Sequence, residues 1–277
     1  MEGRMMGRWL RVTALLVALG LPLAAPAGES CYRGLPVPAE PRVERALYVM
    51  VDQTTPLDEE LKARVRALVA DWGREGDHLE LARFSANIRG YYPELVFEGT
   101  VERVPDEAYL FQLRYDDKQR LLRCLESQRD AVQSGFFSGL ETVLAGMDYK
   151  IPKTDLFYAL HLLSERMIDN GEAPERVVLL VTDGLENSAV TSFYHRGRVR
   201  KIDPRRELAK VRKAGLLANW KGSRIYVYGL GLMPDAKDYL DPRRVMRLKA
   251  FWERYFVAGN GEVMELGTPE FFRRRLE

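Results

Sequence analysis

Two runs of the chain are apolar at every position, and an aspartate follows each of them closely. Residues 46–51 read Ala-Leu-Tyr-Val-Met-Val before Asp52, and residues 177–181 read Val-Val-Leu-Leu-Val before Thr182 and Asp183. A strand buried on both faces of a parallel sheet has this continuous pattern, whereas a half-exposed strand alternates between apolar and polar residues. The pattern therefore predicts two central parallel strands with a carboxylate at the exit of each.

The remaining segments alternate between helical and strand-like patterns. Apolar residues at helical spacing predict amphipathic helices over residues 57–72, 118–147, 154–167 and 242–255. The second of these is either one long helix or two helices broken near Gly135. Strand-like runs cover residues 78–85, 94–102, 225–228 and 263–266, and the prolines around residues 94–102 favour an edge strand there. Strands that alternate with helices predict an α/β fold with a mostly parallel six-stranded sheet and helices on both faces.

The first residues have the parts of a signal peptide. Three arginines precede an apolar run over residues 12–23, and Ala25 and Ala27 supply small residues for cleavage before Gly28. The run is short for a membrane span. We therefore expect residues 1–27 to be a signal peptide, residues 28–41 an N-terminal extended arm and residues 42–277 one domain, in the periplasm or secreted. An uncleaved N-terminal anchor is the alternative.

Removal of residues 1–27 also changes the charge balance. That segment holds three arginines and one glutamate, so the formal charge of +2 falls to zero. Proteins that bind nucleic acids or anionic membranes through general electrostatics carry a strong positive excess. The balance argues against both classes, and no further segment is apolar enough to predict a membrane span.

The chain has two cysteines, Cys31 and Cys124. In an oxidising compartment such a pair is a candidate disulfide. Closing a loop of about ninety residues would add about 4 kcal/mol of stability in the chain-entropy model. Two unpaired thiols that lie too far apart to bond are the alternative.

Residues with carboxylate or hydroxyl side chains follow the predicted strands. Asp52 and Thr54 come after the first buried strand, Asp183 after the second, and Thr154 at the start of a helix. In open α/β sheets ligands bind at the carboxyl ends of the strands, near the point where the strand order reverses. The sequence thus places carboxylate and hydroxyl side chains at one edge of the sheet.

This arrangement resembles the metal-ion-dependent adhesion site of von Willebrand factor A (vWA) domains. In that family the first strand ends in Asp-x-Ser-x-Ser, a later loop supplies a Thr, and the fourth strand ends in an Asp. Asp52, Thr54, Thr154 and Asp183 match these positions. The resemblance extends in element order from about residue 42 to the C-terminus. It implies a three-layer Rossmann-like vWA fold, a Mg²⁺ or Mn²⁺ ion, and a protein partner whose acidic residue completes the metal shell.

One position departs from the family pattern. Pro56 stands where the second Ser is expected, and its side chain has no oxygen. Thr55 is an additional candidate ligand beside it. The missing hydroxyl predicts a degenerate site that binds a cation more weakly, because water can take the vacant position. Alternatively, Thr55 and Pro56 simply begin the next helix, and Thr154 caps its own helix.

Residues 196–213 are strongly basic. They include nine lysines and arginines against two acids, Asp203 and Glu207. Arg196, Arg198 and Arg200 are candidates for binding an anionic protein, glycan or lipid headgroup. A solvated loop and helix face is the alternative.

No catalytic group of residues stands out. Asp52 is similar to the nucleophile of haloacid-dehalogenase phosphatases, whose motif is Asp-x-Asp-x-Thr, but Thr54 replaces the second Asp. The three histidines lack the spacing of metal ligands. We therefore expect no enzyme but a protein-binding domain for adhesion, reception or complex assembly. The alternatives are a metal-free scaffold subunit of an envelope complex and a haloacid-dehalogenase-like phosphatase.

Overall fold

A computed structural model describes residues 30–36, 42–85, 93–148, 150, 154–169, 173–196, 198–233, 240–268, 270–271 and 275–276. The expected signal peptide, residues 1–27, lies outside these residues. Among the residues described, no helix combines the length and the apolar character that crossing a bilayer requires.

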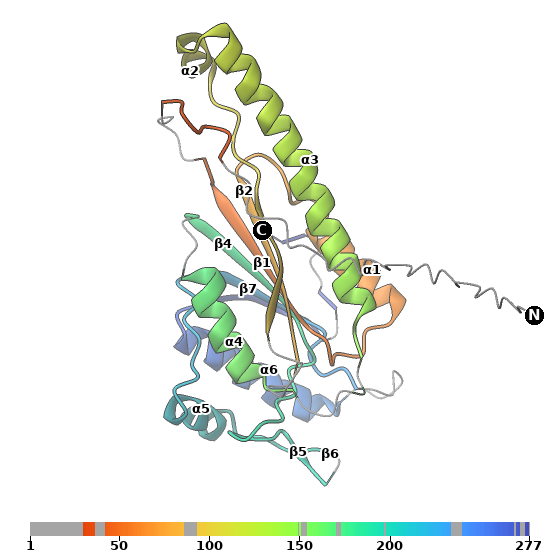
Figure 1. The fold of residues 1–277 in the computed structure, drawn as a ribbon. Helices are drawn as coiled ribbons and strands as arrows, with labels where there is room; N and C mark the ends of the chain where they lie inside the picture. Colours follow the sequence, from red (N-terminus) through yellow and green to blue (C-terminus); the bar gives the residue numbers. More distant parts are fainter. Residues whose placement is uncertain are drawn as a thin grey trace, which may run out of the picture.

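A six-stranded sheet forms the centre of the fold, in the order β3-β2-β1-β4-β7-β8 (Figure 1). Its strands are β1 (Arg45–Asp52), β2 (Asp77–Phe84), β3 (Glu94–Thr100), β4 (Glu175–Val181), β7 (Arg224–Tyr228) and β8 (Glu262–Leu266). All neighbouring strands are parallel except β2 and β3, which are antiparallel. The mostly parallel sheet is confirmed, and β3 lies at its edge as the flanking prolines indicated.

Helices cover both faces of the sheet. They are α1 (Glu59–Val69), α2 (Glu107–Gln112), α3 (Tyr115–Ala145), α4 (Leu156–Leu163), α5 (Pro204–Lys213) and α6 (Pro242–Ala258), with a π-helical turn, η1 (Ser164–Ile168), after α4. α1 and α3 lie on one face and α4, α5 and α6 on the other (Figure 1). Leu47 and Val49 of β1 pack toward the first face, and Tyr48 and Met50 toward the second. Because β1 is buried on both sides, residues 46–51 within it are all apolar.

An aromatic cluster holds the second face together. Phe157 of α4 packs against Phe193, Phe251, Trp252 and Tyr255, with ring centroids 5.7–6.3 Å apart. Rings of this size dominate the energy of a core because each buries a large apolar area. The cluster therefore fixes α4 against α6 and against the segment that follows β4.

Helix α3 is continuous, so the break considered near Gly135 does not occur. The ring of Phe97 in β3 lies so close that a Cβ on Gly135 would be 2.5 Å from its Cε2 atom. The glycine thus serves close packing of helix on sheet. The amino-terminal half of α3 extends past the sheet and carries α2 at its end (Figure 1).

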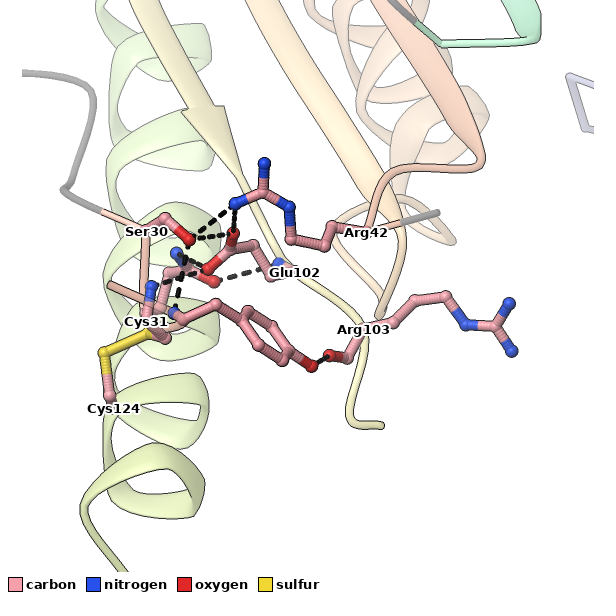
Figure 2. Close-up of a disulfide and its surroundings, with 8 residues drawn as sticks. Ser30, Cys31, Arg42, Glu102, Arg103 and Cys124 are labelled. Carbon is pink, nitrogen blue, oxygen red and sulfur yellow. Dashed lines mark hydrogen bonds and ion pairs between the residues drawn. A yellow bond between two sulfur atoms is a disulfide. The ribbon is translucent and has the colours of Figure 1, made fainter. Parts of the chain in front are cut away.

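The predicted disulfide between Cys31 and Cys124 is confirmed, with Cα atoms 5.6 Å apart. Beside it, the buried carboxylate of Glu102 accepts hydrogen bonds from Ser30 Oγ at 2.6 Å and from the Cys31 amide at 2.7 Å (Figure 2). Arg42 Nη1 forms an ion pair with the same carboxylate at 3.2 Å. These contacts attach the first described residues both to α3 and to the chain that follows β3.

The described part of the N-terminal arm, residues 30–36, is not extended. The Arg33 amide donates to the Ser30 carbonyl at 3.1 Å, and the Leu35 amide donates to the Tyr32 carbonyl at 2.9 Å, which makes two successive turns. The prediction of an extended arm is wrong here because the disulfide and the burial of Tyr32 hold these residues against α3. Residues 28–29 and 37–41 of the arm lie outside the described residues.

Candidate functional site

Strands β1 and β4 are adjacent and parallel, with Val51 opposite Val181. β2 and β3 lie beyond β1 on one side, and β7 and β8 lie beyond β4 on the other, so the strand order reverses between β1 and β4. We call the edge where the parallel strands end the carboxyl edge. Asp52 and Thr182 reach it side by side, and Thr182 Oγ1 donates to Asp52 Oδ2 at 2.8 Å. The candidate residues thus lie at the switch point, where ligands bind in open α/β sheets.

Three of the predicted ligands form a chain of hydrogen bonds at this edge. Asp52 Oδ1 accepts from the Thr54 amide at 2.9 Å and from Thr54 Oγ1 at 2.6 Å. Thr54 Oγ1 also lies 2.6 Å from Thr154 Oγ1. Because the Thr54 hydroxyl has a single hydrogen, which it gives to Asp52, the Thr154 hydroxyl is the donor in the second bond.

Neighbouring loops hold Thr154 in this place. The Asp155 amide donates to the Ser85 carbonyl at the end of β2, at 3.2 Å, and the Asn187 amide donates to the Thr154 carbonyl at 2.9 Å. Glu186 Oε2 accepts from the Leu156 amide at 2.8 Å, at the first residue of α4. The segment after β4 therefore fixes the start of α4, and with it the Thr154 hydroxyl.

Asp183 lies beside these residues and also meets Thr55. The Asp183 amide donates to Thr55 Oγ1 at 3.1 Å, and Asp183 Oδ1 accepts from the Leu185 amide at 2.8 Å. The Thr55 hydroxyl, considered as an additional ligand, thus already has a backbone partner. The same hydroxyl connects the segments that follow β1 and β4.

Two residues of this site were missed by reasoning from the sequence. Thr182, which donates a hydrogen bond to Asp52, was not among the predicted ligands. Glu186 is fully buried and holds α4, but an isolated acid after a strand gives no signal of this role. The metal ligands themselves stay a prediction, although the structure brings the four side chains together.

Burial dominates the electrostatics of the two carboxylates. It raises the pKa of Asp52 from 3.8 to about 6, against hydrogen bonds from Thr54, Thr182 and Thr55 that lower it. Burial, and then the charge of Asp52, raise the pKa of Asp183 well above 3.8. Among the residues described, neither carboxylate has an ion pair with a basic side chain. Two neighbouring acids without a counter-charge favour a bound cation.

We expect the metal-free protein to lose stability as the pH rises from about 4 to about 6. A raised pKa in the folded state means that the folded chain holds a proton that the unfolded chain has released, so stability falls across this window. Asp183→Asn removes one of the two coupled acids and keeps an oxygen that can accept the Leu185 amide. Melting temperatures measured with a chelator should therefore fall less with pH in Asp183→Asn than in the wild type. An equal decrease of melting temperature with pH in the two proteins would contradict this account.

The chemistry of the donors fits a hard divalent cation. Asp52, Asp183, Thr54 and Thr154 offer only oxygen, which suits Mg²⁺ or Mn²⁺, and waters or a partner can supply the remaining positions. Within the described part of the chain, no group of three or more His, Cys, Asp or Glu side chains gathers in a metal-binding arrangement. The site would therefore hold its cation with two carboxylates, which formally balance the charge of the ion, and would leave coordination positions for further oxygen ligands.

The predicted anion-binding arginines lie on a short hairpin of β5 (Tyr194–His195) and β6 (Arg198–Val199) and just after it. Arg196 and Arg198 are exposed. Arg200 instead points inward: its Nη2 lies 2.8 Å from Glu207 Oε1 and its Nε donates to the Ser192 carbonyl at 2.7 Å. Arg200 thus stabilises the segment after β4.

Comparisons with known proteins give likeness in structure only. No family model and no curated protein matches the chain. An aerotolerance-related membrane protein from Bacteroides fragilis is similar over 80% of this chain and 91% of that chain, at 14% identity and a TM-score of 0.37. The SpRpn10 VWA domain is similar over 81% and 88%, at 9% identity and a TM-score of 0.33.

A third similar structure is the vWF domain of the type V pili tip protein Mfa5 from Porphyromonas gingivalis. It is 12% identical, with a TM-score of 0.28, and the comparison covers 53% of this chain and 40% of that one. At these values the comparisons carry no argument about function. The vWA-like fold expected from the sequence is confirmed by the strand order, the single antiparallel edge strand and the helices on both faces of the sheet.

Proposed function

We propose that the chain is a secreted or periplasmic protein-binding domain whose carboxyl edge holds Mg²⁺ or Mn²⁺. Asp52, Thr54, Thr154 and Asp183 would hold the ion, and an acidic residue of a partner protein would complete its shell. The bound ion would supply a Lewis-acidic centre with an open coordination position. The observation that carries this proposal is the meeting of two buried, unpaired carboxylates with two threonine hydroxyls at the switch point.

Binding suits this site better than catalysis. Asp52 is fully buried, and both of its carboxylate oxygens accept hydrogen bonds, from Thr54 and Thr182. A nucleophile for a phosphatase must reach its substrate, and this geometry gives Asp52 no such access. The location outside the cytoplasm is supported by the signal-peptide pattern and by the disulfide, because disulfides persist in oxidising compartments.

A metal-free scaffold is the second candidate, and one observation favours it. The hydroxyls of Thr54 and Thr154 bond each other at 2.6 Å and so have partners without any cation. Pro56 also removes one oxygen that the family pattern supplies. In this case the carboxyl edge would bind partners through its shape and charge alone.

Thermal unfolding with and without cations separates the two candidates. We expect Mg²⁺ or Mn²⁺ to raise the melting temperature of the wild type, because a ligand that binds only the folded state stabilises it by mass action. A concentration of about 100 times the dissociation constant would add about 2.7 kcal/mol. A chelator should reverse the effect.

Asp183→Asn is the matched variant, since it keeps the size of the side chain and removes one ligand charge. We expect it to show no response to either cation. A wild type that also shows no response would favour the metal-free scaffold. A response of equal size in both proteins would place the cation at another site.

A further inference from the structure

Exposed arginines from three separate elements gather near the carboxyl edge. One pair lies on the β5–β6 hairpin, one in the first turn of α5 and one in the first turn of α6. We call this set the basic rim: Arg196, Arg198, Arg205, Arg206, Arg243 and Arg244. α5 and α6 both run back from the carboxyl edge, so their first turns, like the hairpin, belong to that end of the molecule (Figure 1).

Several contacts hold in place the elements that carry the rim. Arg206 Nε lies 3.7 Å from Asp203 Oδ2, just before α5. Arg247 of α6 donates through Nη1 to the Ile202 carbonyl at 3.2 Å, so the first turns of α5 and α6 meet there. The hairpin is fastened to the candidate site, because the Phe193 amide donates to the Glu186 carbonyl at 2.8 Å, three residues after Asp183.

Within the described part of the chain, ion pairs leave most of the charge of the rim unmatched. Among the described residues, only Arg206 of the six has an ion pair, the long contact with Asp203. Some surface arginines elsewhere have close acidic partners, as in Arg66 with Glu141 and Arg83 with Glu94. Others, such as Arg114 and Arg123, have no ion pair among the described residues. The formal charge of the whole chain is only +2. The six arginines therefore place positive charge at this edge, beside the capping carboxylates of Asp203 and Asp241.

We propose that the basic rim binds an acidic segment of a partner protein. This deepens the proposed function, in that it gives the same partner a second contact at the same edge, but it does not require the cation. Uncompensated arginines beside a protein-binding edge increase the rate and specificity of association with a negatively charged partner.

A protein segment fits the rim better than a membrane or a nucleic acid. Of the large hydrophobic residues that the structure describes as exposed, only Met246 lies among these arginines, whereas Phe111 and Tyr115 lie near the far end of α3. Helices that bind at membrane surfaces insert an apolar face beside their basic residues. A formal charge that falls to zero after signal cleavage also disfavours a general nucleic-acid binder.

The test uses a variant with one reversed charge on each element, Arg198→Glu with Arg205→Glu and Arg244→Glu. Among the residues that the structure describes, none of these three side chains forms a hydrogen bond or an ion pair, so the fold should persist, which the melting temperature checks. The matched control, Arg114→Glu with Arg120→Glu and Arg123→Glu, makes the same charge change on exposed residues at the far end of α3. Should the first variant fail to fold, Gln at the same three positions replaces it.

The probe is a fluorescent peptide of glutamates, titrated in the presence of a chelator. We expect the rim variant to raise its dissociation constant at least about tenfold and the control to change it less than about twofold. Added salt should weaken binding to the wild type, because it screens exposed charges.

Equal binding by the rim variant and the wild type would overturn the proposal. So would binding of the wild type to vesicles with anionic lipids but not to the peptide. Because the chelator removes any cation, failure of the proposed metal site would leave this result unchanged. The cation response of Asp183→Asn tests that site separately.

Discussion

Replacement of both Cys31 and Cys124 by serine is expected to lower the free energy of unfolding by about 4 kcal/mol. The bond joins residues 93 apart in the sequence, so it removes much of the entropy of the unfolded chain. For a domain of this size the melting temperature should fall by about 10 °C. Denaturant titration followed by circular dichroism measures the change.

A reducing agent is the control for this prediction. It should lower the stability of the wild type toward that of the double variant and leave the double variant unchanged. The buried contacts of Glu102 with Ser30 and the Cys31 amide persist without the bond, so the domain itself should remain folded. Unfolding of the wild type and the variant at the same denaturant concentration would contradict the prediction.

Gly184→Ala is expected to lower the free energy of unfolding by about 3 kcal/mol or more. Gly184 has a φ of 71°, where residues with a side chain are strained. Its Cβ would lie 2.6 Å from Trp252 Nε1 and would also press against Leu230 Cδ1. The indole of Trp252 donates to the Gly184 carbonyl at 3.0 Å, so the chain cannot move aside without losing that bond.

Gly215→Ala is the matched control, since Gly215 has the same φ of 71° but no atom within 4 Å of the added Cβ. Gly215→Ala introduces backbone strain without crowding, so it should lower the free energy of unfolding by about 1 kcal/mol. Gly184→Ala should also abolish any cation response, because Asp183 precedes the displaced residue. Similar losses for the two variants would show that crowding by Trp252 and Leu230 is unimportant.

The sequence predicted the parts of the fold that depend on simple burial. Residues 46–51 of β1 and 177–181 of β4 are all buried and apolar, as the centre of a parallel sheet requires, so the places of these strands could be predicted from the pattern. The hairpin of β5 and β6, two residues to a strand, is too short to give any such pattern. The turns of residues 30–36 depend on a bond to Cys124 that is distant in the sequence.

The residues of the candidate site likewise include some that the sequence pattern predicts and some that it does not. Asp52, Thr54, Thr154 and Asp183 follow strands or start a helix, so they could be placed at one edge before the structure was known. The role of Arg200 could not be predicted, because the arginine forms an ion pair with Glu207, a buried residue seven positions further along the chain. Tertiary contacts of this kind decide which members of a basic stretch remain available to a partner.

The Cys31–Cys124 bond also determines how the molecule would bear mechanical force. Glu102 follows the antiparallel strand β3, so the attachment of residues 30 and 31 lies at the end of the sheet opposite the carboxyl edge. A pull on the N-terminus against a partner held at the carboxyl edge would reach α3 directly through a covalent bond (Figure 2). The domain would then carry tension along its length, and α3 would share the load with β1.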